Sequence, residues 1–342
     1  MVTMFTPVHT TLGALLLFSG SFGLLMHNGS IFGISSALRN CCFRPSSAGK
    51  AVPLVAGLVT SPALLALIKP SLLPDYNRLT SGSPSWTSFL STLGVGAMIG
   101  WGTKAGKGCT SGHMICGLSR LSPRSFIATA VFFTTALITA NIVPRLTGHD
   151  PVPACEGGQP CWTPVYPSTG EFAVMSTITA LSLVTEFILL PRLLTQSREP
   201  SSSKKRQWLS AYLAGVQFGF GLLFSGMVHP LKELRFFAFP RDLARFDPSL
   251  ALIILFGIGP SLISYLRLQP GRSAAKPTLA EKWDLPTGSV ADIDWKFIIG
   301  SLTWGLAWGV DGTCPGSGVI RAVLNPSWGL PWLTGFAVGS FF

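Results

Sequence analysis

Charged side chains are scarce in this sequence of 342 residues. Asp, Glu, Lys and Arg make up only 11% of it, whereas about a quarter of the residues of a soluble domain are charged. Hydrophobic residues make up 48%, the mean hydropathy is +0.47, and the apolar residues form long runs instead of amphipathic stripes. This composition excludes an ordinary water-soluble core and predicts an integral membrane protein.

Acidic residues are fewer still, with 14 Asp and Glu against 25 Lys and Arg, so the formal net charge is +11. Such a charge can indicate nucleic-acid binding, but here the Lys and Arg sit between apolar runs and not on one face. Positive loops beside a lipid bilayer explain the pattern better, and we expect no nucleic-acid partner. The basic segment of a cleavable signal is also missing, so the first run is expected to remain as a helix.

Apolar runs recur along the whole chain, and a full crossing takes about 20 residues. They fall at residues 10–27, 51–69, 86–101, 125–143, 171–191, 208–228, 249–266, 295–310 and 329–342, which predicts about nine crossings. The last run stops at Phe342 without a polar flank, as it would in a truncated chain.

The basic residues between the runs predict an orientation, because cytoplasmic loops are rich in Lys and Arg. With the amino terminus outside, sixteen of them lie in cytoplasmic loops, Lys296 lies at a helix start, and eight lie on the outer side: Lys69, Arg78, Arg145, Lys232, Arg235, Arg241, Arg245 and Arg321. We therefore expect a multi-pass protein, in the plasma membrane, with its amino terminus outside.

Glycine-rich segments interrupt the apolar runs. Residues 100–124 read GWGTKAGKGCTSGHMICGLSRLSPR, and residues 304–321 read WGLAWGVDGTCPGSGVIR. In both, a glycine precedes a cysteine by nine residues, and residues 27–39 and 224–235 look like earlier copies in each half. Glycine disfavours a regular helix, and irregular backbone at membrane depth is tolerated where it lines a cavity. These segments are therefore candidate pore elements, although loops that merely join helices would explain any single one.

The order of runs and breaks predicts an inverted repeat. The first half covers residues 1–196 and includes a connecting helix at 171–191, a basic linker follows at 197–207, and the second half covers 208–342. The predicted fold is all-α, with about nine transmembrane helices and four short re-entrant segments. Transporters of this design hold their substrate near the midplane, where the breaks meet.

Short helices beginning at Thr110 and Pro315 would point N–H groups and positive dipole ends at the pore, which favours an anion. Cys109, Cys116 and Cys314 lie at these breaks, and a neutral thiol is a weak donor suited to a terminal sulfur atom. Packing is the alternative role, and it is preferred for Cys116. The other residues predicted to line the path are Lys107, Gly108, Thr110, Ser111, Gly112, His113, Pro315 and Gly316.

Ionisable residues near membrane depth are functional candidates, with a solvated loop position as the alternative; here they are Lys104, Lys107, His113, His229 and Asp311. Glu186 belongs to no repeated segment and is interpreted as a packing or interface residue. Cys155 and Cys161, in a loop on the outer side, are either disulfide-bonded or two free thiols.

The stretch GCTSGHMICGLSRLSPRS (108–125) resembles the YeeE/YedE sulfur-transport family, and FGLLFSGMVHPLKELRFF, FDPSLAL and WGLAWGVDGTCPGSG resemble the companion half that relatives encode separately. The resemblance implies thiosulfate uptake through a cysteine relay, here Cys109 and Cys314, between re-entrant helices. Relatives often carry another cysteine in the first broken segment, where this chain has Gly33, Ile34, Ser35 and Ser36, with Cys41 and Cys42 shortly after.

The sequence thus favours a passive or ion-coupled transporter of a small sulfur anion, with no cofactor and no metal. A cytoplasmic sulfur-carrier protein is a further expected partner. One alternative is a membrane thiol oxidoreductase or sulfurtransferase using Cys109 and Cys116, but their spacing is not Cys-x-x-Cys. Another is a metal-binding protein, but the His and Cys positions lack zinc-site spacing.

Overall fold

The computed structural model describes residues 4–76, 85–147, 152–194, 200–271 and 274–342. These residues form helices and no β-strand, apart from one isolated bridge between Ser30 and Asp284. The all-α prediction is therefore confirmed. Of the predicted linker, residues 200–207 belong to a helix. Its first part, together with Arg78, Arg198 and Arg272, lies outside the described residues.

Long helices occupy the predicted apolar runs. They are α1 (Pro7–Asn28), α3 (Pro45–Ile68), α4 (Trp86–Ala105), α5 (Pro123–Thr147), α6 (Thr169–Val184) continued by η4 (Thr185–Leu189) and α7 (Leu190–Leu194), α8 (Pro200–Ser225), α10 (Ser249–Ile253) continued by η5 (Ile254–Ile258) and α11 (Gly259–Leu268), α12 (Trp295–Asp311) and α14 (Pro326–Phe341). In the described part of the chain, six helical stretches are long and apolar enough to cross a bilayer: α1, α3, α5, α6–α7, α8 and α10–α11. Crossings at α4, α12 and α14 stay a prediction.

Four short helices of the described chain follow the predicted breaks, and we call them the central helices. They are α2 (Ile34–Phe43), the π-helix η2 (Thr110–Leu118), α9 (Pro230–Phe237) and α13 (Pro315–Leu324). Single turns of 3₁₀ helix occur at η1 (Pro70–Leu72), η3 (Glu156–Gly158) and η6 (Val290–Asp292).

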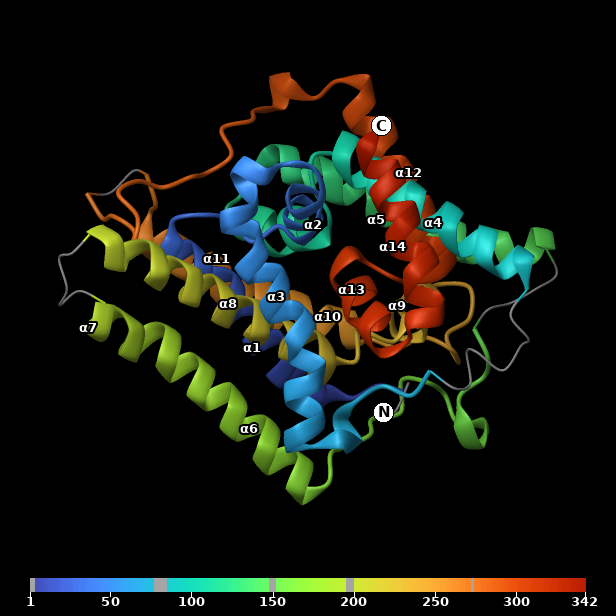
Figure 1. Ribbon diagram of the computed structural model, residues 1–342. Helices are drawn as coiled ribbons and strands as arrows, with labels where there is room; N and C mark the ends of the chain where they lie inside the picture. The colour runs from blue at the N-terminus through green and yellow to red at the C-terminus, as the bar shows by residue number, and fades with distance from the viewer. Residues whose placement is uncertain (1–3, 77–84, 148–151, 195–199, 272–273) are drawn as a thin grey trace.

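The long helices run between two ends of the molecule (Figure 1). At the disulfide end, the backbone of Cys161 bonds to both Phe5 and Ala244, and Cys161 is disulfide-bonded to Cys155. This pairing settles the alternative left open for the two cysteines. At the other end, which we call the long-loop end, Gly29 accepts a bond from Asp284, in the loop that follows α11.

The two halves of the chain share one interior, because helices of one half pack mainly on helices of the other. α1 and α3 pack on α8, while α4 packs on α12 and α14, and α5 on α12. Glycines permit the close approach of α1 and α8: a methyl group added to Gly13 would lie 2.6 Å from the carbonyl oxygen of Gly221. Small residues at helix contacts are typical of membrane bundles.

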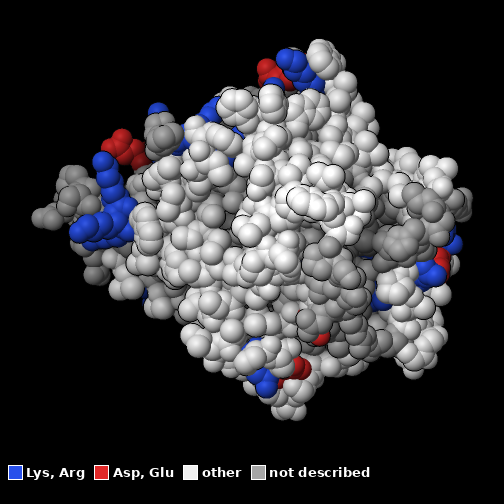
Figure 2. Space-filling model, turned by 45° about the vertical axis from the view of Figure 1, so that its right-hand side comes forward, with Lys and Arg blue, Asp and Glu red and all other residues white. Residues whose placement is uncertain are grey.

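The outer surface is apolar where the long helices face outward. Figure 2 shows a broad uncharged area on one face, with Lys, Arg, Asp and Glu gathered at its edges. Large hydrophobic side chains are exposed on several of these helices, among them Leu67, Phe126, Leu181, Leu255 and Leu330. An apolar surface of this extent is unusual for a soluble monomer and suits contact with lipid.

Candidate functional site

The central helices begin where the sequence breaks the long ones. Gly312 ends α12 with φ +63°, a left-handed conformation that glycine adopts without strain. Two residues later Cys314 caps α13, and Pro315 is its first residue, where a missing N–H costs nothing. Cys109 likewise precedes η2, which begins at Thr110. Both helix starts predicted from the sequence are confirmed.

The amino-terminal ends of the central helices meet in the interior. The backbone N–H of Ile34, at the start of α2, donates to Oγ of Ser111 in the first turn of η2 (3.1 Å). Ile34 also touches α13, because a methyl group added to Gly316 would lie 2.8 Å from its Cδ1. A methyl group on Gly312 would lie 2.5 Å from the carbonyl oxygen of Pro230, the first residue of α9. We call this meeting point the junction.

Cys109 and Cys314 flank the junction. Cys109 is 1% exposed, and its Sγ lies 3.3 Å from Oγ of Ser111. Cys314 is 8% exposed and accepts a hydrogen bond from Oγ of Ser317 at 3.3 Å. Ile34 contacts the first turns of both helices that these cysteines precede, η2 and α13. Both cysteines that the sequence repeat singled out are thus buried at the starts of helices that meet at the junction.

Glu233 of α9 is a junction residue that the sequence analysis missed. Its buried carboxyl accepts a hydrogen bond from the indole N–H of Trp308 and lies near the Cys314 thiol. It also interacts with Asp311 at the end of α12. The signal was present, because Glu233 is the acidic residue in the FSGMVHPLKELR copy (224–235) and such groups at membrane depth are rarely incidental.

The remaining predicted residues divide between the junction and the surface. Thr110, Ser111 and Gly112 form the first turn of η2, and Gly112 faces open space. His113 is buried, with Nδ1 bonded to Ser125 and Nε2 to the carbonyl of Gly106, so both ring nitrogens are occupied. This histidine ties the loop before η2 to α5.

Lys107 lies away from the junction. Its side chain is exposed, and Nζ donates to the carbonyl oxygen of Asp292 at 3.4 Å. The N–H and hydroxyl of Ser289 lower the pKa of the Asp292 carboxyl, so this acid stays charged beside the lysine. Lys104 is also at the long-loop end, donating to the carbonyl oxygen of Phe341.

His229 and Asp311 lie on the disulfide side of the junction. His229 accepts a bond from the Leu231 N–H and stacks on the Tyr76 ring. Asp311 pairs with Arg321, whose guanidinium lies 3.7 Å from the centre of the Trp328 ring. The positive guanidinium of Arg321 thus lies on the disulfide side of the junction, close to the carboxyl-terminal end of α13.

Glu186, interpreted from the sequence as a packing or interface residue, lies where three helices meet. It lies in the π-helical turn η4, is fully buried, and its Oε2 is 3.2 Å from Nε2 of His27. Gln217 donates to its other oxygen at 2.9 Å. Spacing in the sequence could not predict these contacts, because Glu186, His27 and Gln217 belong to three different helices.

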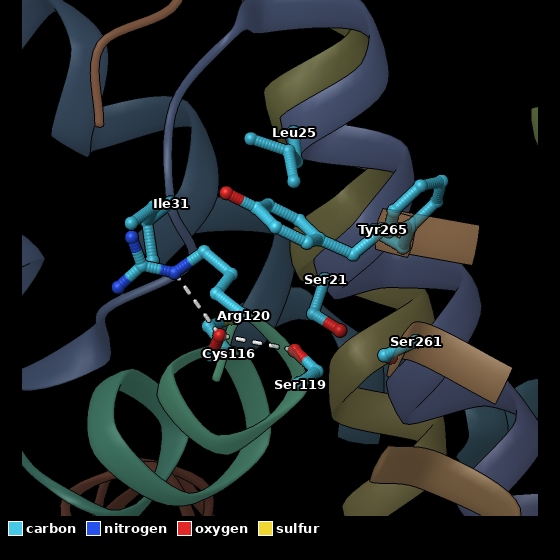
Figure 3. A pocket seen from close by; sticks show the side chains of 9 residues that line it. Ser21, Leu25, Ile31, Cys116, Ser119, Arg120, Ser261 and Tyr265 are labelled. Carbon is cyan, nitrogen blue, oxygen red and sulfur yellow. Dashed lines mark hydrogen bonds between the residues drawn. The ribbon is translucent and has the colours of Figure 1, made fainter. Parts of the chain in front are cut away.

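A pocket opens near the other end of η2, toward the long-loop end (Figure 3). It is small, with room for about one water molecule. It lies between η2, α1 and α11 and is lined by Ser21, Phe22, Leu25, Ile31, Cys116, Ser119, Arg120, Ser261 and Tyr265. Cys116, for which the sequence analysis preferred a packing role, therefore lines a pocket. Its thiol lies 3.5 Å from the Phe32 carbonyl oxygen.

Apolar spanning helices, an apolar outer face and short helices meeting inside define a multi-pass integral membrane protein. Residues 206–333 match a family described as a family of unknown function, DUF6691. A protein of Xylella fastidiosa strain Temecula1 named "Probable transporter" is 36% identical over 132 residues, which is 39% of this chain and 91% of the relative. A protein of the same name from strain 9a5c is 34% identical over 132 residues, with the same coverage of both chains. The chain belongs to the family of these proteins.

Proposed function

We propose that this protein is a membrane transporter that carries a small sulfur-containing anion, such as thiosulfate, through the junction by way of Cys109 and Cys314. The single observation that carries the proposal is the meeting of the central helices at their amino-terminal ends, with both thiols beside it. Helix amino termini present free N–H groups and a positive dipole end, so the junction favours an anion.

The thiols supply the preference for sulfur. A buried neutral thiol offers a weak S–H donor and a polarizable surface, so it contacts the terminal sulfur of thiosulfate without binding it tightly. In this scheme the anion passes from Cys314 to Cys109 without a covalent step, and the central helices are the re-entrant elements that face it from both sides.

Two comparisons support this assignment. The relatives of known sequence are named as probable transporters. The GCTSGH segment and its counterpart around Cys314 resemble the YeeE/YedE family, and this resemblance implies thiosulfate uptake.

The test is uptake of labelled thiosulfate into vesicles reconstituted with the purified protein. Cys109→Ala and Cys314→Ala should each lower the initial rate at least about tenfold, because each removes a thiol from the narrow junction. Cys42→Ala is the matched control, since Cys42 is exposed at the end of α2 and should leave uptake unchanged.

Folding of each variant is checked by gel filtration and thermal unfolding in detergent. Unchanged uptake in both the Cys109→Ala and the Cys314→Ala variant would contradict the proposed cysteine relay. Conversion of thiosulfate by the detergent-solubilised protein would instead favour an oxidoreductase or sulfurtransferase that uses Cys109 and Cys116.

A further inference from the structure

Glu233 is a buried acidic side chain at the junction that has no cation of its own. Its side chain is 3% exposed, and in the described part of the chain no Lys, Arg or His forms an ion pair with it. The hydrogen bond that its carboxyl accepts comes from a neutral donor, the indole N–H of Trp308. A buried carboxylate without a paired charge is costly, and a bound proton removes that cost.

The nearest lysine is committed to other partners. Lys232 precedes Glu233 in α9, and its Nζ donates to Oδ2 of Asp247 at 3.0 Å. It also donates to the hydroxyls of Thr6 and Ser249, both at 2.9 Å. These three acceptors use the three N–H groups of the ammonium. Lys232 therefore neutralises Asp247 and not Glu233.

The other carboxyl at the junction has its own counterion. Nη1 of Arg321 lies 3.8 Å from Oδ2 of Asp311 and donates to the hydroxyl of Thr313 at 3.2 Å. Asp311 also acts on Glu233, and a charge of the same sign opposes a second negative charge beside it. Of the two acids, Glu233 is therefore the one whose negative charge is uncompensated.

The elements packed against α9 are α5, α10 and α12. α5 contacts it through the Phe133 ring and the Asn141 amide, neither of which titrates. Near Glu233, the described part of α9, of these elements and of α13 with its cap carries the following titratable or charged groups: His229, Lys232, Arg235, Asp247, Asp311, Cys314 and Arg321. Of these, the Cys314 thiol is the group at which the anion is proposed to bind, so a test has to separate its proton from that of Glu233.

The charge of Glu233 decides whether an anion can lie beside Cys314, because the carboxyl is near that thiol. An ionised carboxyl repels the anion, and the repulsion is strong in an interior from which water is excluded. A protonated carboxyl does not repel it and offers an O–H donor in addition. The anion and the proton therefore favour each other's binding.

We infer that Glu233 is a proton-binding site of the junction, and that the sulfur anion binds beside Cys314 together with a proton on the Glu233 carboxyl. The inference deepens the proposed function and rests on it for the ligand and its position. It also fixes the sign of the pH dependence. Loss of the proton from Glu233 opposes the anion, so the affinity for the anion falls as the pH rises.

The experiment is calorimetric titration of the purified full chain in detergent with thiosulfate, at constant ionic strength and at a series of pH values from neutral to alkaline. For the wild type, Kd should rise with pH by up to about tenfold per pH unit, the limit for one linked proton. Glu233→Gln keeps the size of the side chain and an acceptor for Trp308, and its Kd should not change with pH. Glu186→Gln is the matched control, since Glu186 is also a fully buried carboxyl but lies among α1, η4 and α8. It should keep the wild-type pH dependence.

Cys314→Ser separates the thiol from the carboxyl, because it keeps a donor at this position and removes the titrating thiol. Its Kd should still rise with pH. A wild-type Kd that is independent of pH would overturn the proton site without any variant. The same pH dependence in Glu233→Gln as in the wild type, or its loss in Cys314→Ser, would also overturn it.

Uptake of labelled thiosulfate into vesicles, measured in parallel, separates this inference from the transport proposal. Uptake by a wild-type protein whose Kd does not depend on pH would remove the proton site and leave transport. Binding that depends on pH through Glu233, without uptake, would remove transport and leave the proton site. Absence of both binding and uptake would remove both.

Discussion

The buried pair His27–Glu186 joins three helices inside the bundle. His27 ends α1, Glu186 lies in the connecting stretch α6–α7, and Gln217 of α8 donates to the same carboxyl. Nδ1 of His27 is bonded to Thr278 of the long loop at 3.2 Å. Together with Phe187, which stacks on Phe18 and Phe22, this network holds the connecting stretch against α1 and α8.

Glu186→Ala should lower the free energy of unfolding by about 1–3 kcal/mol, because the buried amide of Gln217 loses its acceptor, whereas Nε2 of His27 keeps the backbone carbonyl oxygen at this position. The double variant His27→Ala/Glu186→Ala should lose less than the sum of the single losses, since each single change already breaks the same contact. The measurement is unfolding by sodium dodecyl sulfate in mixed micelles. Glu281→Ala, at an exposed loop position, is the control that should change nothing. Additive losses would show that the two side chains are not coupled.

At the scale of elements, the contact between α1 and α8 depends on glycine. Gly13 and Gly221 face each other so closely that a methyl group on either would lie within 3 Å of backbone atoms of the other helix. Backbone cannot move aside as a flexible side chain can, so the helices must separate to admit a larger residue.

Gly13→Val should therefore lower the midpoint of thermal unfolding in detergent by several degrees, following an expected loss of about 1–3 kcal/mol. Gly94→Val on α4 is the matched control, because nothing lies within 4 Å of a methyl group there. Equal unfolding midpoints for the two variants would show that the α1–α8 contact accommodates valine without a loss of stability.

Local signals predicted the elements and the position of the cysteines. Glycines before a Cys-Pro or Cys-Thr step marked the starts of α13 and η2, and the apolar runs marked the long helices. The sequence did not predict that η2 winds as a π-helix, nor the bond from Trp308 to Glu233, nor the pairing of His27 with Glu186. The bond to Glu233 and the pairing of His27 with Glu186 join residues far apart in the chain, and periodicity and spacing carry no record of such contacts.

At the scale of the whole molecule, the central helices leave the junction in opposite directions. η2 ends beside Tyr265 and Leu25 at the long-loop side, whereas α9 ends near residues 152–153 and α13 ends beside Trp328 at the disulfide side. Opposite directions are expected of two halves related by inversion across the membrane plane. The junction is then approached from both ends, with Arg120 on one side and Arg321 on the other.

Two independent cues give the same orientation for this molecule. The excess of Lys and Arg predicts that the long-loop end is cytoplasmic, and a disulfide persists on the oxidising, outer side of a membrane, which is where that orientation puts Cys155 and Cys161.

Exposed Cys42, at the end of α2, therefore should react with a membrane-impermeant maleimide in inverted vesicles and not in intact cells. Cys42→Ser is the control that should abolish the labelling, because Cys41 beside it is half-buried. Labelling of Cys42 from outside intact cells would reverse the orientation, and with it the direction in which an anion passing Cys314 and then Cys109 would travel.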